Sequence, residues 1–200
     1  MSFFSRLLSK KPAPIVVVSG LPRSGTSMMM KMLEAGGLPP LTDELRTADD
    51  DNPKGYYEFE RVKKLEDGDV AWLPGAQGKA VKIITALLTH LPDDYAYQVI
   101  FMRRALPEVL ASQRKMILNR GEDPDKVDDA ELTRLFEKHL AQVEAWIAAH
   151  PNVQRLDVDY RAMVKDPQPF IAQINRFLGG RLDEAKMAAV VDPNLYRQRK

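Results

Sequence analysis

The chain has 200 residues, of which 44% are hydrophobic, a proportion that suits one domain with an adequate core. Its 29 basic residues balance 28 acidic ones, so charge predicts neither a nucleic-acid partner nor a membrane-surface partner. Cysteine is absent from the sequence, which excludes disulfide bonds, thiolate metal sites and a cysteine nucleophile.

The first 13 residues are expected to form a tail or short helix ahead of a single α/β domain over residues 14–200. This stretch is basic and amphipathic, but its apolar run is short and no small-residue cleavage site follows, unlike a secretory signal. No apolar run in the chain approaches the ~20 residues of a transmembrane helix. These features predict a soluble, cytoplasmic protein.

The most informative stretch covers residues 15–27. Four β-branched residues at 15–18 predict a buried parallel strand, and a glycine-containing turn leads directly into a helix that begins near Thr26. Such a unit directs backbone N–H groups and the positive end of a helix toward a phosphate-like anion. The spacing from Gly20 to Gly25 matches a nucleotide triphosphate loop, but the lysine expected next is Thr26. Arg23 instead supplies the cation, which favours an anion other than the β- and γ-phosphates of ATP.

Strand and helix patterns then alternate along the chain. Residues 41–57 are acidic and loop-like, and they are long enough to predict a functional loop. Strands are expected at 79–84, 97–102 and 152–158, and helices at 26–35, 58–67, from 106 onward, 132–147, 167–178 and 183–191. The predicted fold is a three-layer α/β fold of the P-loop type, with a central parallel sheet and helices on both faces.

A second candidate anion site lies at the end of the strand over 97–102. Arg103 and Arg104 leave this strand at its carboxyl end, and Ser112 follows early in the next helix. Ligands of open α/β sheets bind beyond the carboxyl ends of the strands, so this group is expected at the same edge as the first loop. Arginine offers a planar set of donors suited to phosphate, to which serine adds another.

At these residues the chain resembles the sulfotransferase family that uses 3′-phosphoadenosine 5′-phosphosulfate (PAPS), its bacterial members in particular. Residues 22–27, Pro-Arg-Ser-Gly-Thr-Ser, resemble the 5′-phosphosulfate loop, and Arg104 with Ser112 eight positions later resembles the 3′-phosphate motif. Residues 52–58, Asn-Pro-Lys-Gly-Tyr-Tyr-Glu, are similar to a segment of bacterial members, and Asp159-Tyr160 with Asp166-Pro167 to a later strand–helix junction. The resemblance covers about residues 14–197.

Two departures from the family pattern bear on the site. The family's Asp/Asn-Pro after the motif arginine is Ala105-Leu106 here, which leaves open whether Arg103 or Arg104 holds the 3′-phosphate. The glycine-rich basic loop that closes over the cofactor in cytosolic animal members is absent.

The resemblance implies transfer of a sulfuryl group from PAPS to a hydroxyl or amine of a small-molecule or glycan acceptor. Arg23 would stabilise charge on the bridging oxygen, because sulfuryl transfer needs alignment and charge stabilisation. No metal is expected, and the three histidines have no metal-ligand spacing. The residues implied to bind the donor are Arg23, Ser24, Gly25, Thr26, Ser27, Arg104 and Ser112.

Catalysis also needs a group that accepts the proton of the acceptor. Glu58 is the predicted general base, with His90, Asp43 and Glu44 as alternatives. Lys82 interrupts an apolar strand, so it either extends from an edge strand to solvent or faces an anion at the site. Some members of the family that the chain resembles carry a reactive-site lysine on the corresponding strand, so the resemblance implies a catalytic role for Lys82 beside Arg23 and Glu58.

Two other functions remain open from the sequence. A nucleotide or small-molecule kinase would share the loop, but it would be expected to carry the missing lysine and a strand-end aspartate for magnesium. A non-catalytic nucleotide-binding module would keep the loop without turnover. The sequence carries no pattern that identifies the acceptor or the oligomeric state.

Overall fold

The computed structural model describes residues 12–43, 57–124, 126 and 128–192. Within these residues four strands form one sheet in the order β2-β1-β3-β4, and all neighbouring strands are parallel. The strands are β1 (Ile15–Gly20), β2 (Ala80–Lys82), β3 (Tyr97–Arg103) and β4 (Val153–Asp159). The parallel sheet predicted from the alternating pattern is therefore confirmed.

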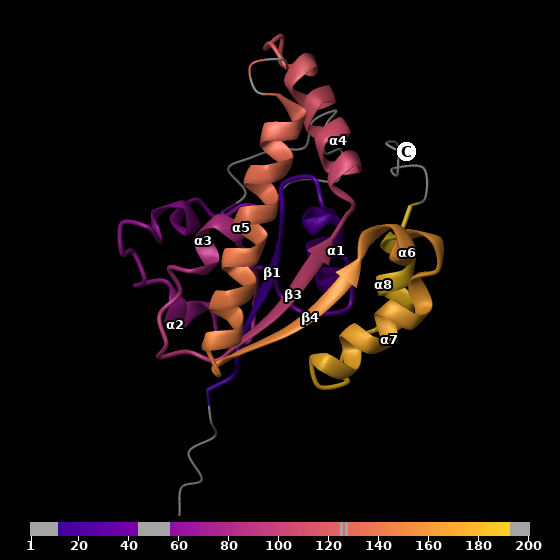
Figure 1. Ribbon diagram of the computed structural model, residues 1–200. Coiled ribbons are helices and arrows are strands. Elements are labelled where there is room, and N and C mark those ends of the chain that lie inside the picture. The colour runs from indigo at the N-terminus through magenta and orange to yellow at the C-terminus, as the bar shows by residue number, and fades with distance from the viewer. Residues whose placement is uncertain (1–11, 44–56, 125, 127, 193–200) are drawn as a thin grey trace, which may run out of the picture.

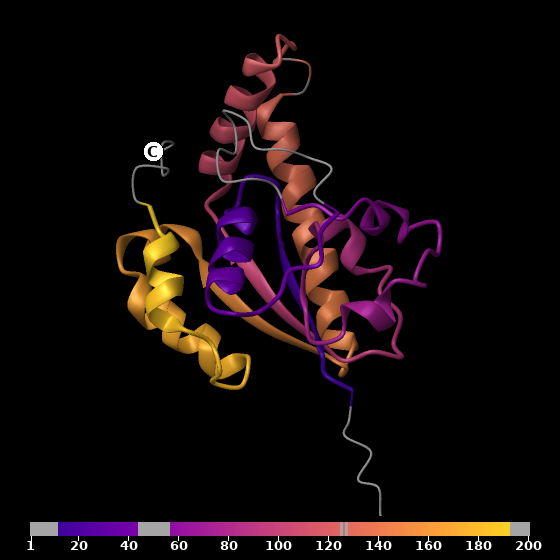
Figure 2. The same cartoon turned by 180° about the vertical axis from the view of Figure 1, so that it is seen from behind.

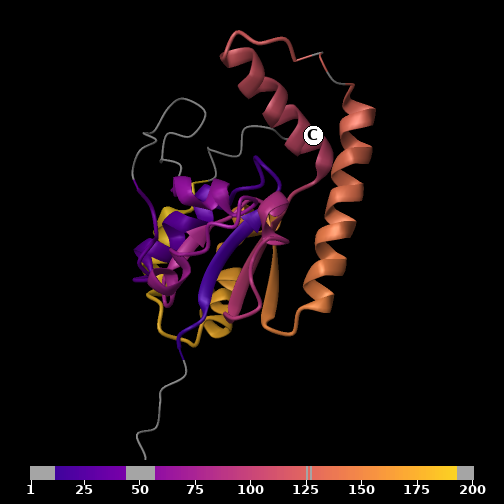
Figure 3. The same ribbon diagram turned by 90° about the vertical axis from the view of Figure 1, so that its left-hand side faces the viewer.

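Helices cover both faces of this sheet, which confirms the predicted three-layer arrangement (Figures 1 and 3). Their bounds are α1 (Thr26–Ala35), the 3₁₀ helix η1 (Glu60–Lys64), α2 (Leu73–Ala76), α3 (Thr85–Leu88), α4 (Leu106–Asn119), α5 (Asp129–Ala149), α6 (Tyr160–Lys165), α7 (Pro167–Phe177) and α8 (Glu184–Val190). The long α5 lies on one face of the sheet, with α2 and α3 beside it. On the other face lie α1 and the helices α6 to α8, as the view from behind shows (Figure 2).

Two apolar cores hold these layers together, one on each side of the sheet. Alternate residues of a strand point to opposite faces, so Val17 and Val81 enter the core beneath α5. Val16 and Val18 enter the core beneath α1, where Met29 is also fully buried. All six residues of β1 are buried because this strand lies between two others and both of its faces are covered.

The structure differs from the expected elements after β2. The strand is shorter than the predicted 79–84, because the chain turns at Ile84 into the short helix α3. Thr85 is buried at the start of α3, and its Oγ1 lies 2.8 Å from Nε2 of His139 on α5. Burial lowers the pKa of His139 below its ordinary value, so its ring is neutral in this contact at pH 7. This polar contact joins α3 to the long helix.

The direction of the strands also determines where a ligand can bind. All four strands run in the same direction, so their carboxyl ends lie at one edge, and α4 projects beyond that edge (Figures 1 and 3). The loop after β1, the end of β2 and the end of β3 therefore lie at the same edge of the sheet. None of the described helices has the length and apolar character needed to span a membrane.

Candidate functional site

The loop between β1 and α1 closes in a left-handed backbone conformation. Arg23 has φ +69° and Gly25 has φ +98°, and the Ser24 amide donates to the Leu21 carbonyl at 3.2 Å. Gly25 is the N-cap of α1, and having no side chain it leaves the first helical N–H groups to other acceptors. Thr26 and Ser27 lie half-buried in the first turn. This geometry suits an anion bound at the start of the helix.

Ser24 behaves differently from its neighbours in the loop. Its side chain is 1% exposed, and its Oγ has no hydrogen-bond partner among the described residues. It borders a cavity of about 20 Å³ beneath the loop that Met102 and Arg104 also line. Such a volume accommodates one water molecule. The Ser24 hydroxyl therefore faces the interior, and its backbone amide already bonds within the loop.

Gly25 packs directly against the ring of Tyr160, the first residue of α6. A Cβ atom built on Gly25 would lie 2.3 Å from Cδ2 of that ring, closer than any real contact. The loop therefore needs glycine both for its backbone conformation and for its contact with α6.

Replacing Gly25 by alanine is expected to lower the free energy of unfolding by about 2–5 kcal/mol, since left-handed strain adds to overpacking. Gly37 offers a matched control, because it has the same φ of +98° and no atom within 4 Å of a built Cβ. Gly37→Ala should lose only about 1–2 kcal/mol through backbone strain. Urea unfolding of both variants measures the difference, and equal losses would show that the Tyr160 contact does not constrain the loop.

The two predicted anion-binding segments meet at this loop. Arg23 Nε donates to Oγ of Ser112 on α4 at 3.0 Å, and Arg104 Nη1 donates to the Arg23 carbonyl at 2.8 Å. Arg104 Nε also donates to Oε2 of Glu108 at 3.0 Å, and this pair is almost fully buried. Segments 81 positions apart in the chain thus bring two guanidinium groups and a serine hydroxyl together. Guanidinium groups of this kind bind phosphate-like anions well.

Arg103 lies apart from this group although it precedes Arg104. Its Nε donates to Asp157 at 2.7 Å, its Nη2 donates to Glu144 at 2.6 Å, and its guanidinium lies 4.5 Å from the centre of the Phe101 ring. Successive side chains at a strand end point in opposite directions, which separates the two arginines. The arrangement favours Arg104 over Arg103 as the residue that meets a ligand of the loop.

Two further residues of this group were not among the predicted site residues. Tyr160 lies with its ring 4.9 Å from the Arg104 guanidinium, and burial raises the pKa of its phenol while Arg104 opposes that rise. Glu108 is the buried partner of Arg104, one helical turn before Ser112. The sequence pattern that could have identified Glu108 is an acidic residue four positions after an arginine at a helix start, a spacing that allows an ion pair. Tyr160 was noted only as part of a strand–helix junction.

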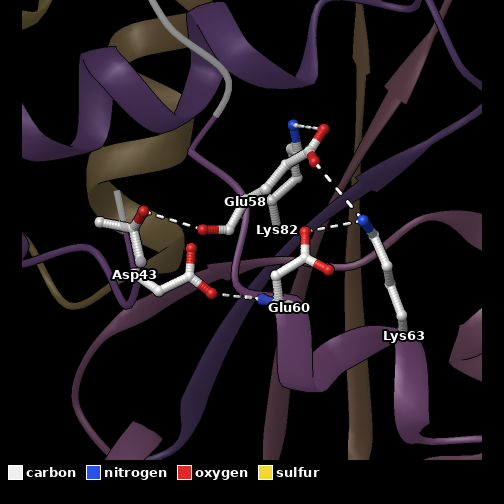
Figure 4. Close-up of polar contacts among 6 residues, drawn as sticks. Asp43, Glu58, Glu60, Lys63 and Lys82 are labelled. Atoms are coloured by element: carbon white, nitrogen blue, oxygen red, sulfur yellow. Dashed lines mark hydrogen bonds and ion pairs between the residues drawn. The ribbon is translucent and has the colours of Figure 1, made fainter. Parts of the chain in front are cut away.

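A second polar cluster lies beside the end of β2 (Figure 4). Lys82 Nζ lies 3.8 Å from Oε1 of Glu58, and Lys63 Nζ lies 4.0 Å from Oε2 of the same carboxylate. Lys63 also pairs with Glu60 at 2.7 Å. The Lys82 side chain is only 10% exposed, so its charge is compensated by Glu58 and not by full hydration. The structure thus joins Lys82 and Glu58, two residues that sequence patterns had singled out separately.

One contact holds the backbone of Glu58, and another holds the residue before it. The Thr42 hydroxyl donates to the Glu58 carbonyl at 2.8 Å. On the other side, Tyr57 has a left-handed φ of +53° and donates its hydroxyl to Glu34 of α1. Burial, followed by Glu34, raises the pKa of the Tyr57 phenol, so the hydroxyl remains a donor. The contact of Thr42 with the Glu58 carbonyl and the contact of Tyr57 with α1 therefore fix the position of Glu58.

The three alternative bases differ in their surroundings. Asp43 Oδ2 accepts the Glu60 amide at 2.6 Å, so this carboxylate caps the start of η1 (Figure 4). His90 is exposed in the turn after α3, and no contact between described residues links it to Glu58 or Lys82. Glu44 and most of the predicted acidic loop lie outside the described residues. Of these candidates, Glu58 is the one for which the structure gives an ion-pair distance to Lys82, 3.8 Å.

Other features of the described residues lie away from both clusters. A hollow of about 350 Å³ follows α4 and is lined by Pro107, Leu110, Ala111, Arg114, Lys115, Leu118 and Asp129. Arg23, Arg104 and Glu58 are not among its lining residues. The described part of the chain holds no group of three or more histidine, aspartate or glutamate side chains arranged for a metal ion.

One comparison with known proteins shows the family of this chain. The sequence profile described as the Sulfotransferase family matches residues 59–184, more than half of the chain. This match begins directly after Glu58, so it includes Lys82, Arg104 and Ser112 but not the loop with Arg23. No curated protein matches the chain.

Similar solved structures share the fold at low sequence identity. The crystal structure of sulfotransferase STF1 from Mycobacterium tuberculosis H37Rv has a TM-score of 0.57 at 18% identity, covering 88% of this chain and 70% of that one. The sulfotransferase domain from the curacin biosynthetic pathway gives 0.47 at 16%, covering 92% and 79%. A structure described as a sugar kinase from Janibacter sp. HTCC2649 gives 0.43 at 15%, covering 90% and 99%. The first similarity shows the fold, and the other two are too distant to carry an argument.

Proposed function

The chain belongs to the sulfotransferase family, an enzyme family that uses PAPS, and from this membership we propose that it sulfates a hydroxyl or amine of a small-molecule or glycan acceptor. The acceptor oxygen or nitrogen forms a bond to sulfur while the bond from sulfur to the bridging oxygen of PAPS breaks. The acceptor proton passes to a base. The products are the sulfated acceptor and adenosine 3′,5′-bisphosphate.

The observation that carries the donor assignment is the bond from the Arg104 guanidinium to the Arg23 carbonyl. PAPS is anionic at both ends, so it needs two neighbouring groups of cationic donors. Arg23 with the N–H and hydroxyl groups of Gly25, Thr26 and Ser27 is assigned to the 5′-phosphosulfate. Ser24 contributes through the shape of the loop, because its hydroxyl faces inward. Arg104 and Ser112 are assigned to the 3′-phosphate.

The acceptor end is assigned to the cluster around Glu58. Its carboxylate takes the proton of the acceptor, and Lys82 places a positive charge at 3.8 Å that holds the carboxylate in position. Lys82 is paired in register with Val18, two residues before the end of β1, so it leaves the sheet beside the loop. The proposal includes no metal ion, because the guanidinium groups supply the positive charge that the transferred group requires.

A thermal-shift comparison of nucleotides tests the donor assignment. Adenosine 3′,5′-bisphosphate should stabilise the protein strongly, by about 2.7 kcal/mol at 100 times its dissociation constant, and AMP much less. Arg104→Ala should remove this preference, whereas the matched variant Arg103→Ala should keep it, since Arg103 pairs away from the loop. Each variant is compared with its own unliganded melting temperature.

Other outcomes of the same experiment support the alternative functions. Stabilisation by ATP with magnesium in place of the bisphosphate, together with ATP turnover, would indicate a kinase. Strong binding of the bisphosphate without transfer from PAPS to any acceptor would indicate a non-catalytic module.

A further inference from the structure

Glu108 is a buried acid within a group of residues that otherwise suits an anion. Its side chain is 3% exposed and lies in the first turn of α4, where Oε2 accepts from Arg104 Nε at 3.0 Å. Ser112 follows one turn later on the same buried side of the helix. A carboxylate so close to the buried Arg104 guanidinium weakens the positive potential that a phosphate would meet. Its presence therefore needs an explanation beyond anion binding.

The contacts of Arg104 show what Glu108 does for the geometry. The guanidinium is held at Nε by Glu108 and at Nη1 by the Arg23 carbonyl, and its plane lies near the Tyr160 ring. Contacts on these sides restrict the arginine to one orientation before any ligand binds. A preorganised guanidinium loses less conformational entropy when it binds a phosphate. Glu108 thus contributes to binding through position.

The charge of Glu108 acts in the opposite direction. A phosphate that bonds both Arg104 and Ser112 lies close to the Glu108 carboxylate, since the carboxylate touches one of these residues and lies one turn from the other. At an effective dielectric constant of about 20, like charges separated by roughly 7–10 Å change a binding constant by about tenfold or more. Position and charge therefore have opposite effects on the affinity for a 3′-phosphate.

We propose that Glu108 is a positioning residue of the donor site, which orients Arg104 for a 3′-phosphate while its negative charge limits how tightly that phosphate is held. This inference rests on the proposed donor assignment. Its consequence for turnover is faster release of the bisphosphate product, which carries the same 3′-phosphate as PAPS.

Two conservative variants separate position from charge. Glu108→Gln keeps an oxygen that accepts from Arg104 but removes the charge, so the affinity for adenosine 3′,5′-bisphosphate should rise about tenfold. Glu108→Asp keeps the charge but withdraws the carboxylate by one methylene group, so the affinity should fall by about threefold or more. Isothermal titration calorimetry measures both. AMP lacks the 3′-phosphate, so its affinity should stay within about twofold in each variant.

The matched control is a carboxylate that pairs with the neighbouring arginine, Arg103. Glu144→Gln removes an exposed carboxylate that pairs with Arg103 at 2.6 Å, and it should change neither nucleotide affinity. Circular dichroism and melting temperatures verify that each variant is folded, and a variant that melts early is measured below its transition.

The outcomes distinguish this inference from the proposed function. If the unaltered protein binds the bisphosphate no better than AMP, the donor assignment itself fails, and the inference fails with it. If the unaltered protein prefers the bisphosphate but Glu108→Gln binds it no tighter, the charge effect is refuted. If Glu108→Asp binds as tightly as the unaltered protein, the positioning role is refuted. An increase for Glu108→Gln with a decrease for Glu108→Asp supports the proposal.

Discussion

Replacement of Arg23 by alanine is expected to lower the rate of sulfuryl transfer by about 10²–10³-fold, while the protein remains folded. The expected loss is typical for removal of one electrostatic group that stabilises charge developing in the transition state. Arg23 is placed for this role by its left-handed φ of +69°, in the loop that leads into α1. Initial rates with saturating PAPS and a series of hydroxyl and amine acceptors measure the effect.

The structure offers controls for this variant. Arginine and alanine meet the same backbone strain at a positive φ, so Arg23→Ala should not add strain of its own. The variant loses the bond to the Ser112 hydroxyl, worth about 1 kcal/mol, and the loop keeps its backbone contacts, so its melting temperature should fall only slightly. Arg23→Lys keeps the charge without the planar donor geometry, and an intermediate rate is expected. Near-full turnover of Arg23→Ala would remove Arg23 from the mechanism.

Replacement of Glu58 by glutamine is expected to lower turnover by about 10²–10⁴-fold, the usual contribution of a general base. Glutamine has the same shape but does not accept the proton of the acceptor. The variant should still bind adenosine 3′,5′-bisphosphate with unchanged affinity, because Glu58 contacts Lys82 and Lys63 and belongs to the cluster at the end of β2. Activity and calorimetry on the same preparation separate the two effects.

The matched control is Glu60→Gln, which removes a carboxylate two residues away that pairs with the same lysine, Lys63. Its turnover should remain within about twofold of the unaltered enzyme. Asp43→Asn tests the alternative base; asparagine keeps an oxygen that accepts the Glu60 amide, so both stability and turnover should change little. A larger loss of turnover in Asp43→Asn than in Glu58→Gln would transfer the role of base to Asp43.

Most of the fold could be predicted from local patterns. The buried run at 15–18 and the periodic apolar residues of the longest helix identify elements whose burial and backbone conformation depend on near neighbours in the chain. Two short helices, α3 and α6, were not predicted. α3 and α6 contain four and six residues, too few for a helical period to be visible in sequence. Their formation depends on contacts such as the bond between Thr85 and His139, which lie 54 positions apart.

The candidate site was likewise predictable only where it depends on residues close in the chain. Local sequence was sufficient for the loop with Arg23 and Gly25, because a glycine turn between a buried strand and a helix specifies its own anion-binding geometry. It also identified Lys82 and Glu58 as unusual residues, but it did not relate one to the other. Their pairing at 3.8 Å depends on how the segment around Glu58 returns to the end of β2.

Composition, periodicity and the first loop alone were therefore enough to predict the parallel α/β architecture and the strand–loop–helix unit to which an anion site is assigned, because these properties arise between residues close in the chain. The folded chain was needed to separate Arg104 from Arg103, to bring Glu58 to Lys82 and to reveal Glu108 as a buried partner. These relations depend on strand register and on the direction in which each side chain points at the end of a strand. Contacts between segments as far apart as Arg23 and Arg104 are made only when the whole sheet is assembled.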